Sequence, residues 1–180
     1  LGLYGQDLIE FVPHWKLLLG GRYDDFSADY KSATTTYSRN DRVFSYRTGL
    51  MYQPSDYSTY YTSYGTSFNP SGDLYAIEAL NTASAAKVDP EKSINMEVGA
   101  KWELFNGDLS LRTALFRSEK TNERNTDQAE TSTVLLSGRR HTDGVEFEGN
   151  GKLTKKLEIF GAIAFMKAKI DRHINPYLEG

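Results

Sequence analysis

Polar and apolar residues alternate along the chain between Glu91 and Trp102, and this alternation is the feature that most limits the possible folds. Successive side chains of a β-strand point to opposite faces, so a period of two predicts a strand with one apolar and one polar face. The apolar positions are Ile94, Met96, Val98, Ala100 and Trp102, and the polar ones are Glu91, Ser93, Asn95, Glu97 and Lys101, with Gly99 among them.

A tight turn follows this strand at Asn106-Gly107. This dipeptide is typical of two-residue hairpin turns in which both central residues have positive φ. A hairpin closed there pairs residues whose numbers sum to 213, so that Val98 lies opposite Leu115 and apolar faces meet without a slip. The same register places Trp102 opposite Leu111, Ala100 opposite Thr113, and Lys101 opposite Arg112. We expect Glu103 or a neighbouring strand to offset the repulsion in the last pair.

Similar extended segments recur along the chain and predict about eight antiparallel strands. The last segment is apolar on both lines, and we expect its outward line to be Phe160, Ala162, Ala164, Met166 and Ile170, because the other line ends in Lys167 and Lys169. Besides 91–102 and the strand after Asn106-Gly107, the expected strands are 2–11, 15–24, 42–52, 57–68, 142–149 and 157–170.

The predicted connections alternate in length. The short ones are 12–14, 53–56, 106–107 and about 150–156, and the long ones are about 27–40, 69–90 and 121–133. In an antiparallel meander this alternation places every tight turn at one end of the sheet and every long polar loop at the other. Outer-membrane barrels have short periplasmic turns and long outer loops of this kind.

Composition excludes several other functions. The 180 residues carry a net charge of −3, which disfavours a polyanionic partner such as nucleic acid, and there is no cysteine for a disulfide or a thiolate site. Of the three histidines, His141 shares a strand line with Asp143, but a metal site needs three or four converging ligands. We therefore expect no catalytic residues and no metal site, and the chain is predicted not to be an enzyme. No initiator Met or export signal precedes Leu1, so we expect a piece of a longer chain.

A spanning sheet in hydrocarbon must be closed, because no water is present to satisfy unpaired backbone groups. The aromatic residues fit the two girdles of such a barrel. Trp15, Tyr52, Tyr57 and Trp102 lie near the short turns, and Tyr23, Phe44, Tyr64 and Phe68 lie towards the long loops. The charged residues of the polar lines are expected to neutralise each other in a polar lumen: Arg22, Asp24, Arg47, Glu97, Lys101, Arg112, Glu146 and Glu148.

Several segments, in order, resemble the barrel of TonB-dependent siderophore receptors. They are Tyr4-Gly5-Gln6-Asp7, Gly21-Arg22-Tyr23-Asp24, Ser63 to Pro70, Asp89 to Ser93, Glu97 to Trp102, Ala114 to Asn122, Gly138-Arg139-Arg140 and Asp143 to Glu146. The segment from Ala114 to Asn122 is most similar to the catecholate-siderophore branch. The resemblance implies that residues 1–180 are a partial barrel domain, supplying about eight of 22 strands, without the N-terminal plug and coupling segment.

The same resemblance implies a function: import of a ferric siderophore across the outer membrane of a Gram-negative type of cell, driven by the TonB complex. The implied partners are the ferric siderophore, outer-membrane lipid, and the TonB complex through the missing N-terminal region. No resident cofactor is expected, since the iron–siderophore complex is cargo.

An anionic, aromatic ligand of this kind calls for cations and aromatic faces at the loop end. The candidate ligand-binding residues are Tyr37, Arg39, Arg42, Tyr75, Arg124, Arg139 and Arg140, with Tyr30 beside them. Two other interpretations stay open at this point. One is a self-contained eight-stranded outer-membrane barrel with a structural or adhesive role, and the other is a soluble β domain that binds carbohydrate.

Overall fold

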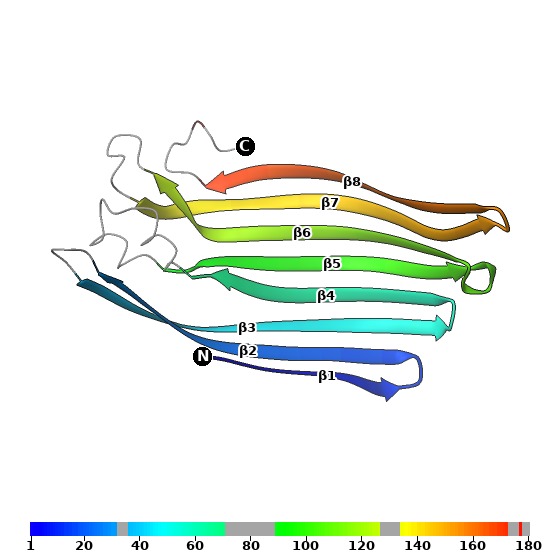
Figure 1. The fold of residues 1–180 in the computed structure, drawn as a ribbon, viewed down its shortest axis with the longest axis horizontal. Helices are drawn as coiled ribbons and strands as arrows, with labels where there is room; N and C mark the ends of the chain where they lie inside the picture. The colour runs from blue at the N-terminus through cyan, green and yellow to red at the C-terminus, as the bar shows by residue number, and fades with distance from the viewer. Residues whose placement is uncertain (32–35, 71–88, 127–133, 173–176, 178–180) are drawn as a thin grey trace.

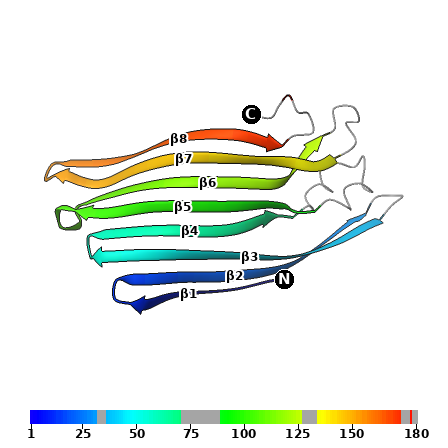
Figure 2. The same cartoon turned by 180° about the vertical axis from the view of Figure 1, so that it is seen from behind.

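The chain forms one antiparallel sheet of eight strands in sequential order, β1 to β8 (Figures 1 and 2). The structure, a computed structural model, describes residues 1–31, 36–70, 89–126, 134–172 and 177. The predicted eight-stranded antiparallel meander is confirmed. The strands are β1 (Gly2–Val12), β2 (Trp15–Lys31), β3 (Thr36–Ser55), β4 (Ser58–Asn69), β5 (Glu91–Leu104), β6 (Leu109–Thr126), β7 (Val134–Thr154) and β8 (Leu157–Arg172).

The connections are segregated between the two ends of the sheet, as predicted. Figure 1 shows the tight turns β1–β2, β3–β4, β5–β6 and β7–β8 on the right and the three other connections on the left. Of the residues that the structure describes, none belongs to a helix long and apolar enough to cross a membrane.

The β5–β6 hairpin forms in the predicted register. Asn106 and Gly107 have φ of 60° and 92°, and the Asp108 N–H donates a hydrogen bond of 3.2 Å to the Phe105 carbonyl. The pairs Trp102↔Leu111, Ala100↔Thr113, Val98↔Leu115 and Lys101↔Arg112 are all confirmed. The repulsion in the last pair is offset as expected, since Lys101 lies 2.7 Å from Glu103 and Arg112 lies 3.3 Å from Glu97.

Two hairpins extend further than the alternation predicts. β2 and β3 stay paired up to Lys31↔Thr36, and β6 and β7 up to Thr126↔Val134. The predicted loop boundaries at 27–40 and 121–133 are therefore wrong. Backbone hydrogen bonds continue to pair the strands in these segments. Neither face needs to be apolar there, so the alternation of polar and apolar residues stops before the strands end.

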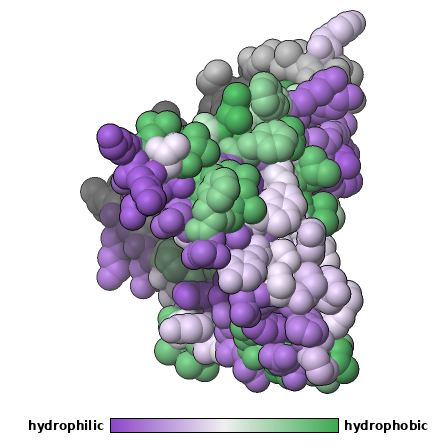
Figure 3. All heavy atoms as spheres, turned by 90° about the vertical axis from the view of Figure 1, so that its right-hand side faces the viewer, coloured by the Kyte–Doolittle hydropathy of each residue, from purple (hydrophilic) through white to green (hydrophobic). Residues whose placement is uncertain are grey.

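The sheet is a single layer. Among the described residues, the only buried apolar side chains are Ala100, Leu109 and Ala114, whereas Val98, Leu115 and Phe165 are more than half exposed. Seen from the turn end, side chains of near-neutral hydropathy run along one flank and a group of hydrophilic ones lies on the opposite flank (Figure 3). No second layer of described residues covers the apolar face, which contradicts the two-sheet core that a soluble β domain would need.

Candidate functional site

The register divides the side chains between two faces of the sheet, because directly paired residues of neighbouring strands point to the same side. One row crosses seven strands: Leu17, Leu50, Thr62, Val98, Leu115, Val145 and Phe165. We call this side the outer face and the opposite side the polar face. All eight charged residues predicted to line a lumen lie on the polar face, at Arg22, Asp24, Arg47, Glu97, Lys101, Arg112, Glu146 and Glu148.

The predicted outward line of β8 is wrong. Val145 pairs with Phe165 and Phe147 pairs with Ile163, so the odd line of β8 belongs to the outer face. Phe160, Ala162, Ala164, Met166 and Ile170 therefore lie on the polar face. The lysines that suggested the opposite assignment, Lys167 and Lys169, follow Phe165 on the outer line and come after its apolar stretch has ended.

Aromatic rings form two rows on the outer face. Near the turns, ring centroids are 4.6 Å apart in Trp15–Tyr52, 6.5 Å in Tyr52–Tyr60 and 6.3 Å in Tyr60–Trp102. Towards the other end, the distances are 6.3 Å in Phe44–Tyr46 and 5.8 Å in Tyr46–Tyr64. Two such rows bordering an apolar band are the girdles that mark the membrane interfaces of an outer-membrane barrel.

The end of the apolar band gives the tilt of the strands. On β8 the outer face turns from apolar to charged between Phe165 and Lys167. The row of paired residues that contains Phe165 crosses β3 at Leu50. On β3, however, the outer face stays uncharged for six more residues towards the loop end, as far as Phe44. The boundary thus moves six residues along the strand, about 20 Å at ~3.4 Å per residue, over five strand spacings that amount to about 24 Å. The corresponding angle of about 40° falls in the ~35–45° range of strand tilt in outer-membrane barrels.

Charged groups pair with each other in the middle of the polar face. Arg112 on β6 lies 3.3 Å from the Glu97 carboxylate on β5 and 3.8 Å from that of Glu146 on β7. The Tyr61 hydroxyl on β4 donates a hydrogen bond to Glu97 and accepts one of 3.3 Å from Arg112. The predicted mutual neutralisation is confirmed for this group, which links four neighbouring strands on the polar face.

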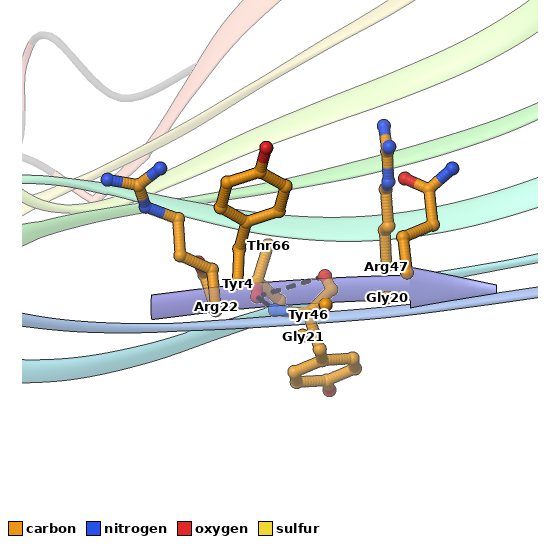
Figure 4. A pocket seen from close by; sticks show the side chains of 10 residues that line it. Tyr4, Gly20, Gly21, Arg22, Tyr46, Arg47 and Thr66 are labelled. Atoms are coloured by element: carbon orange, nitrogen blue, oxygen red, sulfur yellow. Dashed lines mark hydrogen bonds between the residues drawn. The ribbon is translucent and has the colours of Figure 1, made fainter. Parts of the chain in front are cut away.

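A pocket of about 260 Å³ is lined by residues of β1 to β4, among them Gly5, Gly20 and Gly21, which have no side chain to fill it. Figure 4 shows Tyr4, Arg22 and Arg47 projecting to one side of the sheet and Tyr46 projecting to the other. The absence of a side chain at Gly20 leaves space for the side chain of Arg47, because a Cβ at position 20 would lie 3.0 Å from Cγ of Arg47. The pocket is thus lined by two guanidinium groups and a phenol ring, together with glycine backbone and smaller polar side chains such as Gln6 and Ser45.

The two arginines of this pocket differ in how they are neutralised. Arg22 is held by Asp24, with Nε 2.7 Å from the carboxylate. Arg47 is exposed, and none of the described ion pairs includes it. The sequence prediction counted Arg47 as part of the lumen ladder and did not include Tyr4 among the ligand residues, because it took those residues from the loop end. Arg47, which shares its row with Gly20 and Gln6 and lines the same pocket as Tyr4, is the group on this face best suited to an anionic, aromatic ligand.

The predicted ligand arginines of β3 point to opposite faces. Arg39 lies on the polar face and is bound to Asp41 at 2.8 Å, and both side chains are buried, at 9% and 7% exposed. Arg42 lies on the outer face, 3.1 Å from Asp25. The pKa of Asp25, which lies beyond the apolar band, is lowered chiefly by the hydrogen bond from Asn40 and then by Arg42.

The other predicted ligand residues are also separated. Arg139 is on the outer face, 3.1 Å from Glu119, and its neighbour Arg140 is on the polar face. The side chains of Tyr37 and Arg124, and that of Tyr30, lie outside the described part of the structure, as does the whole of Tyr75. The described residues therefore do not bring the predicted set together at one place.

Comparison with known proteins places this sheet in a family. The family model described as "TonB dependent receptor-like, beta-barrel" matches residues 1–180. PiuA of Acinetobacter baumannii, a probable TonB-dependent siderophore receptor, is 32% identical over 182 residues, which cover 95% of this chain and 24% of PiuA. BfrD of Bordetella pertussis, a probable TonB-dependent receptor, is 29% identical and has the same 24% covered. The chain thus spans about a quarter of the length of these relatives.

Solved structures agree with the sequence relatives. The crystal structure of the siderophore receptor PiuA has a TM-score of 0.81 with this sheet at 31% identity, and the match covers 95% of this chain and 25% of that one. The ferric-catecholate import receptor Fiu from E. coli K12, at 22% identity, has a TM-score of 0.76 over 94% of this chain and 27% of its own, and shows the fold alone. Sequence, register and structural likeness lead to one conclusion: this chain belongs to the TonB-dependent receptor β-barrel family of the Gram-negative outer membrane.

Proposed function

We propose that the receptor containing this chain imports a ferric siderophore across the outer membrane with energy delivered by the TonB complex. The observation that carries the proposal is the family match over residues 1–180 together with a relative, PiuA, that is described as a siderophore receptor. In this proposal the outer face contacts lipid, the polar face lines the lumen, and the chain contributes wall and loops but no catalytic chemistry.

Ligand contact is assigned to the pocket lined by Tyr4, Arg22 and Arg47. A ferric catecholate complex is anionic and aromatic, so it gains from a guanidinium group and from a nearby aromatic face. Arg47 is the stronger candidate of the two arginines because Arg22 already binds Asp24 at 2.7 Å. At the loop end, Arg140 is proposed as a vestibule residue because it lies on the same face. Tyr37, Tyr75 and Arg124 are kept as proposed contacts on the sequence argument alone.

The test is uptake of ⁵⁵Fe by cells in which the full-length receptor is the only route for the siderophore. Ferric catecholate, ferric hydroxamate and ferric citrate are supplied separately, with and without a functional TonB protein. We expect TonB-dependent uptake of the catecholate complex. Uptake that continues unchanged without TonB, or uptake of none of the three complexes, would contradict the proposed transport.

The role of Arg47 is tested in the same cells. We expect Arg47→Ala to weaken binding of the transported complex by about 10–150-fold, since a charge-assisted hydrogen bond contributes roughly 1.5–3 kcal/mol. The matched control is Lys156→Ala, which removes a cation from the turn between β7 and β8. Equal affinities of the wild type and Arg47→Ala would remove Arg47 from the binding site while leaving the transport proposal intact.

A further inference from the structure

The outer face changes abruptly from apolar to charged on the last three strands. Residues on one face of a strand are two positions, or about 7 Å, apart. Within that distance the outer face changes from Leu115 to Arg117 on β6 and from Phe165 to Lys167 on β8. The apolar residues of this border are more than half exposed, as expected for groups that contact lipid tails. The charged residues just beyond them therefore lie at the height of the lipid headgroups.

The acids in this region already have side-chain partners. Glu119, with a side chain only 16% exposed, is bound by Arg117 at 3.2 Å and by Arg139 at 3.1 Å. His141 lies 2.7 Å from Asp171, and Asp143 has Arg117 and His141 each at 3.6 Å. Glu119 thus fixes two guanidinium groups side by side, with 43% and 54% of their side chains still exposed.

Lys167 and Lys169 add two further positive charges to this region, and Lys167 lies directly opposite Asp143 in the register. Both are exposed on the outer line of β8, and neither takes part in an ion pair among the described residues. The cations Arg117, Arg139, Lys167 and Lys169 outnumber the acids Glu119, Asp143 and Asp171, so this region has a surplus of positive charge that an external anion can offset. On the outer face, above a lipid-facing row, the anions that are present at high density are the phosphates of lipid headgroups.

We propose that Arg117, Arg139, Lys167 and Lys169 form a docking surface, here called the basic surface, for the phosphorylated headgroup of an outer-leaflet glycolipid. The lysines supply ammonium groups that form no ion pair among the described residues, and the arginines, held by Glu119, offer planar donors suited to phosphate. Leu115 and Phe165 contact the acyl chains of the same lipid. This inference rests on the membrane-barrel fold and is independent of which siderophore the receptor carries.

The experiment titrates the full-length detergent-solubilised receptor with bisphosphorylated lipid A and counts bound lipid by native mass spectrometry. A basic residue near an anionic lipid surface contributes a factor of roughly five in affinity. Lys167→Gln/Lys169→Gln is therefore expected to weaken lipid binding by about 10–30-fold. The matched control, Lys155→Gln/Lys156→Gln, removes two lysines from the turn at the other end of the same hairpin and is expected to bind as the wild type does.

A second arm needs no substitution. The wild-type receptor is titrated with dephosphorylated lipid A, for which we expect at least tenfold weaker binding. Equal binding of the two lipids, or equal losses in the two double variants, would overturn the proposal. Displacement of the lipid by millimolar inorganic phosphate would also overturn it, since the surface would then be a site for free phosphate.

Discussion

The assignment of β8 can be tested by placing one arginine on each of its two lines. In the observed register, Ile163 is on the outer face opposite Phe147, and Ala164 is on the polar face opposite Glu146. Ile163→Arg puts a cation among lipid tails near the middle of the apolar stretch between Ile159 and Phe165. Ala164→Arg puts the same cation into a row that already contains acids.

The expected energies differ clearly. An arginine facing lipid near the bilayer midplane costs about 2–4 kcal/mol in an outer-membrane barrel, which lowers the folded-to-unfolded ratio by a factor of roughly 30 to 800. In Ala164→Arg, the new guanidinium lies beside Glu146, whose carboxylate is 40% exposed and 3.8 Å from Arg112. An ion pair with that exposure contributes about 0–1 kcal/mol, so we expect the variant to stay within ~1 kcal/mol of the wild type.

The measurement is the urea concentration at which half of the full-length receptor loses its heat-modifiable, folded migration in lipid vesicles. We expect a lower midpoint for Ile163→Arg than for Ala164→Arg. Residues 1–180 contain no cysteine. Once any cysteine elsewhere in the receptor has been replaced, single cysteines at the same two positions can carry spin labels whose collisions with oxygen or a water-soluble nickel complex are compared. A larger loss in Ala164→Arg, with a lipid-exposed label at that position, would refute the observed register and restore the opposite assignment.

Two further predictions concern the polar face and the outer end of the sheet. Gly99→Ala should lower the free energy of unfolding by about 1–3 kcal/mol through overpacking, since the new Cβ would lie 2.6 Å from the Tyr61 hydroxyl; urea titration checks this, and a neutral result would show that this side chain moves freely. The hydrogen bond from Asn40 lowers the pKa of Asp25 below its ordinary value of 3.8, so its contribution is present above pH 3.8 and is lost as the pH falls through the lowered pKa. A spin label at Ser38 should become more mobile over that acid range in the wild type, and the same transition in Asp25→Asn would exclude this carboxylate as its source.

Sequence reasoning was most successful where local and long-range signals agree. In the hairpin of β5 and β6, the Asn106-Gly107 turn fixes the register from one end, and the alternation from Ile94 to Trp102 verifies it along the strand. A slip of one residue would place an entire apolar line on the polar face. Pairing could therefore be predicted residue by residue here.

The alternation of polar and apolar residues no longer predicts the faces of a strand where the surroundings of the two faces become similar. On β8 both lines are apolar up to Phe165, so the faces could be separated only through the pairing with Val145 and Phe147. Lys167 and Lys169 misled the assignment because the outer line itself leaves the apolar band. In the hairpin of β2 and β3, both faces meet water beyond Tyr23, and the strands continue without any polarity signal.

The candidate site was harder to predict because spacing along one strand does not show what neighbouring strands supply. Arg39 is a cation at the loop end in sequence, but its side chain is buried and forms an ion pair with Asp41 on the same face. Arg139 and Arg140 are adjacent in sequence and therefore face opposite sides. The proposed contact Arg47 depends on Gly20 of the preceding strand, which becomes a neighbour only through the register.

The extended hairpin of β2 and β3 affects which part of the receptor is accessible at the cell surface. From Tyr23 to Lys31 it continues for eight residues past the aromatic border, about 27 Å of strand, while hydrogen bonds still hold its two backbones together. A rigid, hydrophilic projection of this size reaches past the membrane surface into the medium. Antibodies and other macromolecules that cannot enter the bilayer can bind it there, so an epitope tag beside Ser38 would report on surface display in living cells.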